Sequence, residues 1–151
     1  MKPRLTAQSP PGIDPQRLAL GIQQPWAELI LRGIKTLEIR SLSTNVRGRI
    51  YLYASRQLSA SPASQNAIDR YQIHVDNLPR GSLVGSVDLV DSCLAVPEDA
   101  SSACLSPELL IDQYAWRLAA PERFPEPLPV RFLPYGVWFY PYRRRNGRRS
   151  R

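Results

Sequence analysis

The chain has 151 residues, of which 43% are hydrophobic and 22% charged, and this length suits one domain with a real core rather than two domains. No apolar run approaches the roughly 18 residues of a membrane span, and the N-terminal stretch lacks the apolar core of a signal peptide. We therefore expect a soluble, cytoplasmic protein. Cys93 and Cys104 have the spacing of neither a zinc knuckle nor a redox pair, so the sequence predicts free thiols, no metal site and no cofactor.

The formal net charge of +7 is concentrated at the C-terminus. Residues 143–151, RRRNGRRSR, hold six arginines and no acid, so the rest of the chain is nearly neutral. A basic block of this kind is typically disordered and favours phosphate polymers or an acidic protein surface, although it can also serve only solubility. The pattern predicts a disordered tail in which Arg143, Arg144 and Arg145 contact nucleic acid, with an acidic protein as the alternative partner.

The positions of the prolines indicate how the N-terminal part of the chain is organised. Four prolines within residues 1–17 predict a flexible arm, followed by one domain over residues 18–142. LALGI (18–22) is apolar enough for a short buried strand. QQPWAELILRG (23–33) predicts a helix, because Pro25 fits its first position and Gly33 the left-handed residue after its end.

The middle of the chain alternates between strand and helix patterns. KTLEIR (35–40) and RIYLYAS (49–55) are typical of strands, and SQNAIDRYQI (64–73) is typical of a helix. GSLVGSVDLV (81–90) predicts a strand in which Gly85 marks a bulge or the close approach of other backbone or of a ligand.

The C-terminal part contains two more strand patterns. YAWRL (114–118) and GVWFYPY (136–142) predict strands, and a series of prolines between them predicts an extended crossing, whereas residues 92–113 are ambiguous. About six short strands with two or three helices indicate an α+β domain built on a small β-barrel.

Charged side chains follow the segment 35–40. If this segment is one strand, its side chains alternate between an apolar face and a polar face. The first face holds Lys35, Leu37 and Ile39, and the second holds Thr36, Glu38 and Arg40. On this pattern alone, Glu38 and Arg40 form an ion pair facing water that contributes about 0–1 kcal/mol.

The start of the predicted helix is unusual. Gln24 occupies the position where helices prefer Ser, Thr, Asp or Asn. We therefore expect the amides of Trp26 and Ala27 to be free for an acidic or carbonyl-bearing ligand, with the Trp26 ring as an aromatic surface beside them.

These residues together resemble a known family. GIQQPWAELILRGIKTLEIRS (21–41) resembles the opening of the ASCH domain, the activating-signal-cointegrator homology module of the PUA-like superfamily. Gly33, Lys35, Glu38 and Arg40 match its Gly-x-Lys-x-x-Glu-x-Arg motif. Weaker matching blocks follow in order, and the resemblance extends over about residues 18–140.

The resemblance implies a six-stranded β-barrel with flanking helices, and a cleft between the first helix and the barrel. It also implies binding of RNA or single-stranded DNA, often through recognition of a base or modified nucleotide. The Trp26 ring can stack on a base, and the Glu38 carboxylate can accept a hydrogen bond from an exocyclic amine of a base. Lys35 and Arg40 can donate hydrogen bonds to phosphate oxygens or to base acceptors. Besides the three tail arginines, the expected nucleic-acid-binding residues are Gln24, Pro25, Trp26, Lys35, Glu38, Arg40, Ser41, Ser55 and Trp116.

An enzymatic function is the alternative. Some ASCH-like proteins remove the acetyl group of N4-acetylcytidine with a Lys, a Thr three residues later and a separate Glu. Lys35 matches that Lys, but Glu38 stands in place of the Thr, so the hydroxyl is missing where that mechanism needs it. If the protein is a hydrolase of modified nucleosides or a ribonuclease, Lys35 and Glu38 are the catalytic acid–base pair. The substitution favours binding over catalysis.

Overall fold

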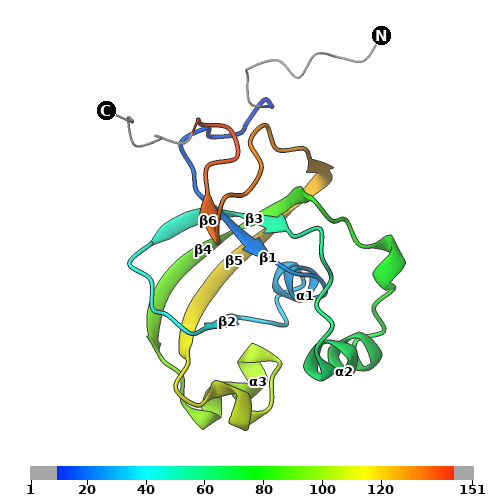
Figure 1. The fold of residues 1–151 in the computed structure, drawn as a ribbon, viewed down its shortest axis with the longest axis vertical. Coiled ribbons are helices and arrows are strands. Elements are labelled where there is room, and N and C mark those ends of the chain that lie inside the picture. The colour runs from blue at the N-terminus through cyan, green and yellow to red at the C-terminus, as the bar shows by residue number, and fades with distance from the viewer. Residues whose placement is uncertain (1–9, 145–151) are drawn as a thin grey trace.

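A computed structural model of the chain describes residues 10–144, which form one curled sheet with helices against it (Figure 1). The strands are β1 (Ala19–Ile22), β2 (Leu37–Arg40), β3 (Gly48–Ala54), β4 (Ser82–Leu94), β5 (Tyr114–Leu128) and β6 (Trp138–Phe139). The helices are α1 (Trp26–Leu31), α2 (Pro62–Arg70) and α3 (Ala100–Ala103), with short 3-10 turns at Val75–Asn77, Pro97–Asp99 and Pro107–Leu110. The predicted α+β domain with a six-stranded, barrel-like sheet is confirmed.

The sheet has the strand order β2-β5-β4-β3-β1-β6. β1 pairs with β3 in parallel, and the other neighbouring strands pair in antiparallel fashion. α1 lies inside the curl of the sheet, while α2 and α3 lie beside it at the end near β2 (Figure 1). This arrangement leaves the end of β2 and the start of α1 facing α2 and α3.

The main core lies between α1 and the sheet. Ile30 of α1 packs with Leu20 of β1, Leu52 of β3, Val87 of β4 and Leu118 of β5, and all of these side chains are buried. Removing such side chains from water is the dominant favourable contribution to folding, about 1.5–3 kcal/mol for each large aliphatic residue. The core therefore fixes α1 within the curl of the sheet.

The folded part begins before the predicted boundary at residue 18. Ile13 packs against a cluster that contains Tyr51, and the Asp14 backbone N–H donates to the Tyr51 hydroxyl over 2.8 Å. The Arg17 guanidinium lies 4.9 Å from the centroid of the Tyr51 ring. Residues 13–17 thus contact the body of the domain through Tyr51, whose side chain supplies partners that the sequence pattern did not reveal.

The C-terminal boundary also differs from the prediction. Arg143 donates to Gln16 Oε1 over 2.8 Å, and its guanidinium lies 3.7 Å from the centroid of the Tyr140 ring. Arg143 thus belongs to the folded part, and Arg144 is exposed. Arg145 and the rest of the predicted tail lie outside the described residues.

β5 is much longer than the predicted strand, because it continues through the proline-rich segment to Leu128. Its partner β2 covers only the stretch from Tyr114 to Arg117, while β4 pairs with it along almost its whole length. Among residues 10–144, no strand pairs with this edge of β5 beyond Arg117, and prolines are tolerated on such an edge since they remove no ladder hydrogen bond.

Gly85 lies where the pairing of β4 with β5 shifts register. A Cβ atom at this position would meet the Glu122 carbonyl oxygen and would lie 2.6 Å from Leu31 Cδ2. The sequence predicted a bulge or a close approach, and both occur. The approaching groups are β5 and α1 of the same chain.

No helix within residues 10–144 has both the length and the apolar character needed to cross a membrane.

Candidate functional site

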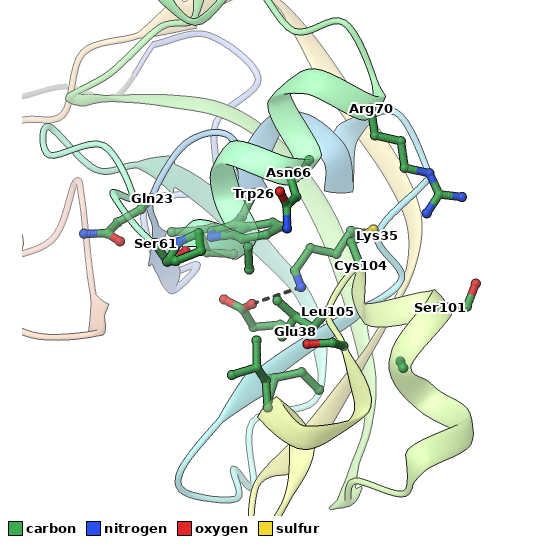
Figure 2. A pocket seen from close by; sticks show the side chains of 18 of the residues that line it. Gln23, Trp26, Lys35, Glu38, Ser61, Asn66, Arg70, Ser101, Cys104 and Leu105 are labelled. Carbon is green, nitrogen blue, oxygen red and sulfur yellow. Dashed lines mark ion pairs between the residues drawn. The ribbon is translucent and has the colours of Figure 1, made fainter.

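A cavity of about 1050 Å³ opens beside β2 (Figure 2). Its walls come from four segments: the turn from β1 into α1, residues 35–40, residues 61–71 around α2, and residues 100–109 around α3. The polar side chains in these walls are Gln23, Lys35, Glu38, Arg40, Ser61, Asn66, Arg70, Ser101, Ser106 and Glu108. Four of the predicted site residues, Trp26, Lys35, Glu38 and Arg40, therefore share one cavity.

Lys35 is buried in the wall of this cavity, with 2% of its surface exposed. Its Nζ donates to the Ala103 carbonyl oxygen over 2.6 Å and lies 3.8 Å from Glu38 Oε1. The same atom lies 5.0 Å from the centroid of the Trp26 ring. Burial lowers the pKa of Lys35, and the nearby Glu38 carboxylate opposes this effect only in part.

The predicted separation of Lys35 and Glu38 onto opposite strand faces is wrong. β2 begins only at Leu37, and Lys35 still belongs to the turn that ends α1. In that turn the backbone N–H groups of Ile34 and Lys35 both donate to the Leu29 carbonyl oxygen, after Gly33 adopts a φ of 75°. Strand alternation does not apply to Lys35, whose side chain points toward Glu38 (Figure 2).

Glu38 lies between two cations. Its Oε2 accepts hydrogen bonds from Arg40 Nη2 over 2.8 Å and from Arg40 Nε over 3.2 Å, while Oε1 faces Lys35. Arg40 Nη2 also donates to the Gly21 carbonyl oxygen over 3.0 Å. Only 7% of the Glu38 surface is exposed, so the interpretation as an ion pair facing water is wrong.

The amides at the start of α1 are not free. Trp26 and Ala27 donate their N–H groups to the Gln23 carbonyl oxygen over 3.0 and 3.4 Å. Gln24 Oε1 accepts from the Glu28 N–H over 2.9 Å, and Gln24 Nε2 donates to the Pro79 carbonyl oxygen over 3.1 Å. Gln24 therefore caps the helix with its longer side chain, and the expectation of a ligand bound to free amides is wrong.

Gln24 and Pro25 are buried next to the cavity without lining it. They place Trp26 at the first position of α1, where its half-buried ring forms part of the wall (Figure 2). Their contribution to the site is thus the position of the Trp26 ring.

Three further predicted residues lie outside the cavity wall. Ser41 is exposed, and Ser55 is half-buried beside Gly21. Trp116 belongs to the core, with 3% of its surface exposed, and its Nε1 donates to the Leu42 carbonyl oxygen over 3.0 Å. Trp116 also stacks on Trp138 at a centroid distance of 5.8 Å, so it is not a wall of the site.

The walls formed by α2 and α3 were not predicted. Asn66 and Arg70 lie one helical turn apart on α2 and line the cavity, as do Ser101 and Cys104 around α3. The spacing of Asn66 and Arg70 indicates a shared helix face, but only the fold shows which face meets the cavity. Residues 92–113 gave no clear pattern in the sequence.

Cys104 is a free thiol in this wall, as the sequence predicted. Its backbone has a φ of 58°, and its Sγ lies 3.9 Å from the Ile34 carbonyl oxygen. Burial raises the pKa of the Cys104 thiol. The positive charge of Lys35 acts in the opposite direction, but its effect on this pKa is smaller than that of burial. The thiol is therefore protonated near neutral pH.

Glu28 ties α1 to β5 on the side away from Trp26. Its carboxylate accepts two hydrogen bonds from Arg123, over 2.8 and 2.9 Å, and one from Arg32 over 2.7 Å. Burial alone would raise the pKa of Glu28, but these hydrogen bonds and the two positive charges outweigh it and hold the pKa below its ordinary value. The bidentate pair holds α1 in a fixed orientation against the sheet.

Within residues 10–144 no three His, Cys, Asp or Glu side chains lie together in a way that would hold a metal ion.

Comparisons with known proteins agree on one family. The model of the ASCH domain matches residues 20–127 of this chain. The chain is 37% identical over 83 residues to activating signal cointegrator 1 of Homo sapiens, and equally to that of Mus musculus. These matches cover 50% of this chain but only 14% of each relative, so the chain spans a small part of their length.

The fold also matches a solved structure. The crystal structure of ASCH from Zymomonas mobilis superposes with a TM-score of 0.56 and 17% sequence identity, covering 84% of this chain and 88% of that one. At this identity the likeness concerns the fold alone.

Proposed function

The chain belongs to the ASCH domain family, and on this basis we propose that it binds nucleic acid, with single-stranded RNA as the preferred ligand, in the cavity beside Trp26. One observation carries the proposal: an accessible tryptophan ring, a buried carboxylate and two cationic side chains line the same cavity. This combination suits a stacked base with a polar edge.

Each wall residue has a role in the proposed complex. The Trp26 ring stacks on one base face, and Glu38, which two cations hold in place, accepts a hydrogen bond from a base N–H group. Lys35 and Arg40 donate to base acceptors or phosphate oxygens through N–H groups that their protein partners leave unused. Arg70 of α2 provides a further cation at the opposite wall.

The size of the cavity favours a short segment of a strand over a single enclosed base. Its volume of about 1050 Å³ lies just above the range of about 300–1000 Å³ that holds most small-molecule ligands. A flipped base held alone would require a tighter pocket. We therefore favour single-strand binding with one base on Trp26.

Fluorescence anisotropy with a labelled single-stranded RNA, and the DNA of the same sequence, tests this function. Since stacking on an aromatic side chain contributes about 1–3 kcal/mol per base, Trp26→Ala should weaken RNA binding by about 5- to 150-fold. Tyr135→Ala removes another partly exposed aromatic ring and serves as the control. Equal affinities of the wild type and Trp26→Ala for both nucleic acids would reject the proposal.

A hydrolase is the second candidate, because Lys35 combines a lowered pKa with a carboxylate 3.8 Å away in the same cavity. This pair suits proton transfer during hydrolysis of an amide in a modified nucleoside such as N4-acetylcytidine, or of an RNA phosphodiester. Incubation with N4-acetylcytidine and with labelled RNA should then give turnover that Lys35→Ala abolishes. Product formation at the level of the variant would exclude this activity.

The arginine-rich C-terminal segment adds a third element to the proposal. Four of its arginines lie in residues 145–151, outside the described part, and we propose that they add phosphate affinity that does not depend on sequence. An acidic protein partner has no support from the relatives or from the described residues. Binding to a protein that survives nuclease treatment would be its signature.

A further inference from the structure

A second hollow, of about 350 Å³, lies at the other end of β1 from the Trp26 cavity. Three arginines, Arg17, Arg47 and Arg49, line it together with Tyr140 and Asp14. Arg143 adjoins it, because its guanidinium contacts both Gln16 and Tyr140 at the rim. We call this surface the arginine groove, and it gathers four guanidinium groups from segments far apart in the sequence.

The arginines of the groove differ in their ion pairs with carboxylates of the protein. Arg49 is engaged by Asp88 at 3.2 Å and by Glu122 at 3.4 Å. Arg47 lies 3.9 Å from Asp91, and both side chains are exposed, so a phosphate can replace that carboxylate at little cost. Arg47 Nη1 also donates to the Thr44 and Val46 carbonyl oxygens, so the remaining N–H groups of Arg47 are the ones available to a ligand. Arg49 contributes to the fixed wall.

Arg17 and Arg143 are available as well. Within residues 10–144 neither is ion-paired with a carboxylate, and each rests on an aromatic ring, Arg17 on Tyr51 and Arg143 on Tyr140. Arg143 Nε has no hydrogen-bond partner among the described residues, although it is buried. Asp14 is the one acid in the lining, and its Oδ1 already accepts from the Gln16 N–H. The available charge in the groove is thus positive.

The arginine groove lies close to the Trp26 cavity, at the opposite end of β1. Leu18, just before β1, lines the groove, and Gly21 and Ile22, at the end of β1, line the cavity. A strand rises about 3.3 Å per residue, so the two sites lie roughly 10–13 Å apart along β1. A few nucleotides of a single strand span this distance, and single-strand sites of small domains commonly cover about 4–16 nucleotides.

We propose that the arginine groove binds backbone phosphates of the same nucleic-acid strand whose base stacks on Trp26. This inference rests on the proposed function and adds the course of the nucleic acid, which runs over the surface from the cavity at one end of the buried strand β1 to Arg17, Arg47 and Arg143 at the other end. The arginine-rich residues after Arg144 continue from this groove in the sequence. Phosphate contacts of this type position a strand and carry no base preference.

The test compares a dinucleotide, which occupies only the cavity, with a 12-nucleotide single-stranded RNA, using the full chain at several salt concentrations. The groove variant is Arg17→Ala combined with Arg47→Ala. The control is Arg56→Ala with Arg80→Ala, which removes the same charge from exposed positions that line neither hollow. Arg47→Glu alone is the second groove variant, because the Arg47 side chain is exposed.

We expect the groove variant to bind the dinucleotide within twofold of the wild type and the 12-nucleotide RNA at least fivefold more weakly. The slope of log affinity against log salt should fall in magnitude by about 1.4, since each phosphate contact to a single strand contributes about 0.7. Arg47→Glu should reduce the slope in the same direction. A slope equal to that of the wild type, or to that of the control, would overturn the proposal.

The same titrations separate this proposal from the proposed function. If Trp26→Ala leaves dinucleotide binding unchanged, the cavity is not the base site and the proposed function fails, whatever the slopes. If Trp26→Ala weakens both ligands while the groove variant behaves like the control, the cavity stands and the groove proposal fails.

Discussion

The Nζ atom of Lys35 lies 3.8 Å from Glu38 Oε1, inside the wall of the cavity, although strand alternation predicted opposite faces for these two residues. The turn after α1 causes the difference, because Gly33 takes a left-handed conformation and Lys35 remains bonded to Leu29 before β2 begins. A lysine with a lowered pKa and a carboxylate thus occupy one site.

Burial of Lys35 should make stability depend on pH in the alkaline range. Its pKa in the folded state is lower than the unfolded value of 10.5, so between these two values the unfolded chain binds more protons and stability rises with pH. The free energy of unfolding of the wild type minus that of Lys35→Met should therefore increase from pH 7 toward pH 10 in urea denaturation. Arg117→Met, which removes an exposed cation outside the buried site, is the control and should give a flat difference. A flat or falling difference for Lys35→Met would contradict this account of its burial.

Glu28 should stabilise the position of α1 through its hydrogen bonds to Arg123 and Arg32. Glu28→Gln should lower the free energy of unfolding at pH 7 by about 1–2 kcal/mol. This loss lies at the low end of what hydrogen bonds to charged groups contribute to stability, because both arginines are partly exposed. Its pKa is lowered in the folded state, so this stabilisation is present above pH 4.5 and is lost as the pH falls through the folded pKa. Urea denaturation at pH 7 and at acidic pH measures both effects.

Glu126→Gln, at an exposed position of β5, is the control, and an equal loss in both variants would exclude the special role of Glu28.

The Gln24 side chain should be needed for the start of α1. Gln24→Ala leaves the buried Glu28 N–H without its partner, which costs about 1–3 kcal/mol, and it also removes the partly buried hydrogen bond to the Pro79 carbonyl oxygen. Thermal denaturation of this variant should show a clear loss of stability, whereas Gln23→Ala, at the exposed neighbouring position, should have little effect. Similar melting temperatures for both variants would argue against the cap.

Gly85 should tolerate no side chain. In Gly85→Ala the added methyl group meets the Glu122 carbonyl oxygen and Leu31, so β5 or α1 must shift, and overpacking of this kind costs about 1–3 kcal/mol. Gly136→Ala is a matched control, because the nearest atom to its Cβ lies at 3.8 Å in ordinary contact. Urea denaturation of the two variants makes the comparison. Equal stability would show that the bulge accommodates a side chain.

The sequence allowed prediction of those features that depend on local pattern. Apolar strand runs and the Pro25 and Gly33 signals indicated most strands and the approximate extent of α1, and the ordered motif blocks indicated the family. The structure brings Trp26, Lys35, Glu38 and Arg40, which the sequence singled out, to the wall of one cavity. Whether that cavity binds a ligand stays a prediction.

The remaining features depend on contacts between distant segments. How far β5 extends through its proline-rich segment depends on its pairing with β2 and β4. The packing of residues 13–17 against the sheet depends on contacts with Tyr51 of β3. The fold alone shows which face of α2 carries Asn66 and Arg70 into the cavity. Gln24 was misjudged because its side chain is one methylene longer than that of Asn and reaches the N–H of Glu28, four residues along.

The central claim is that a base stacks on Trp26, and ¹⁹F NMR of protein labelled with 5-fluorotryptophan tests it most directly. The chain has three tryptophans, and Trp116 and Trp138 stack on each other outside the cavity wall, so they serve as internal controls. During titration with single-stranded RNA, the Trp26 resonance should shift progressively to saturation while the other two change little. A Trp26 resonance that stays in place at RNA concentrations that saturate binding by anisotropy would contradict the account.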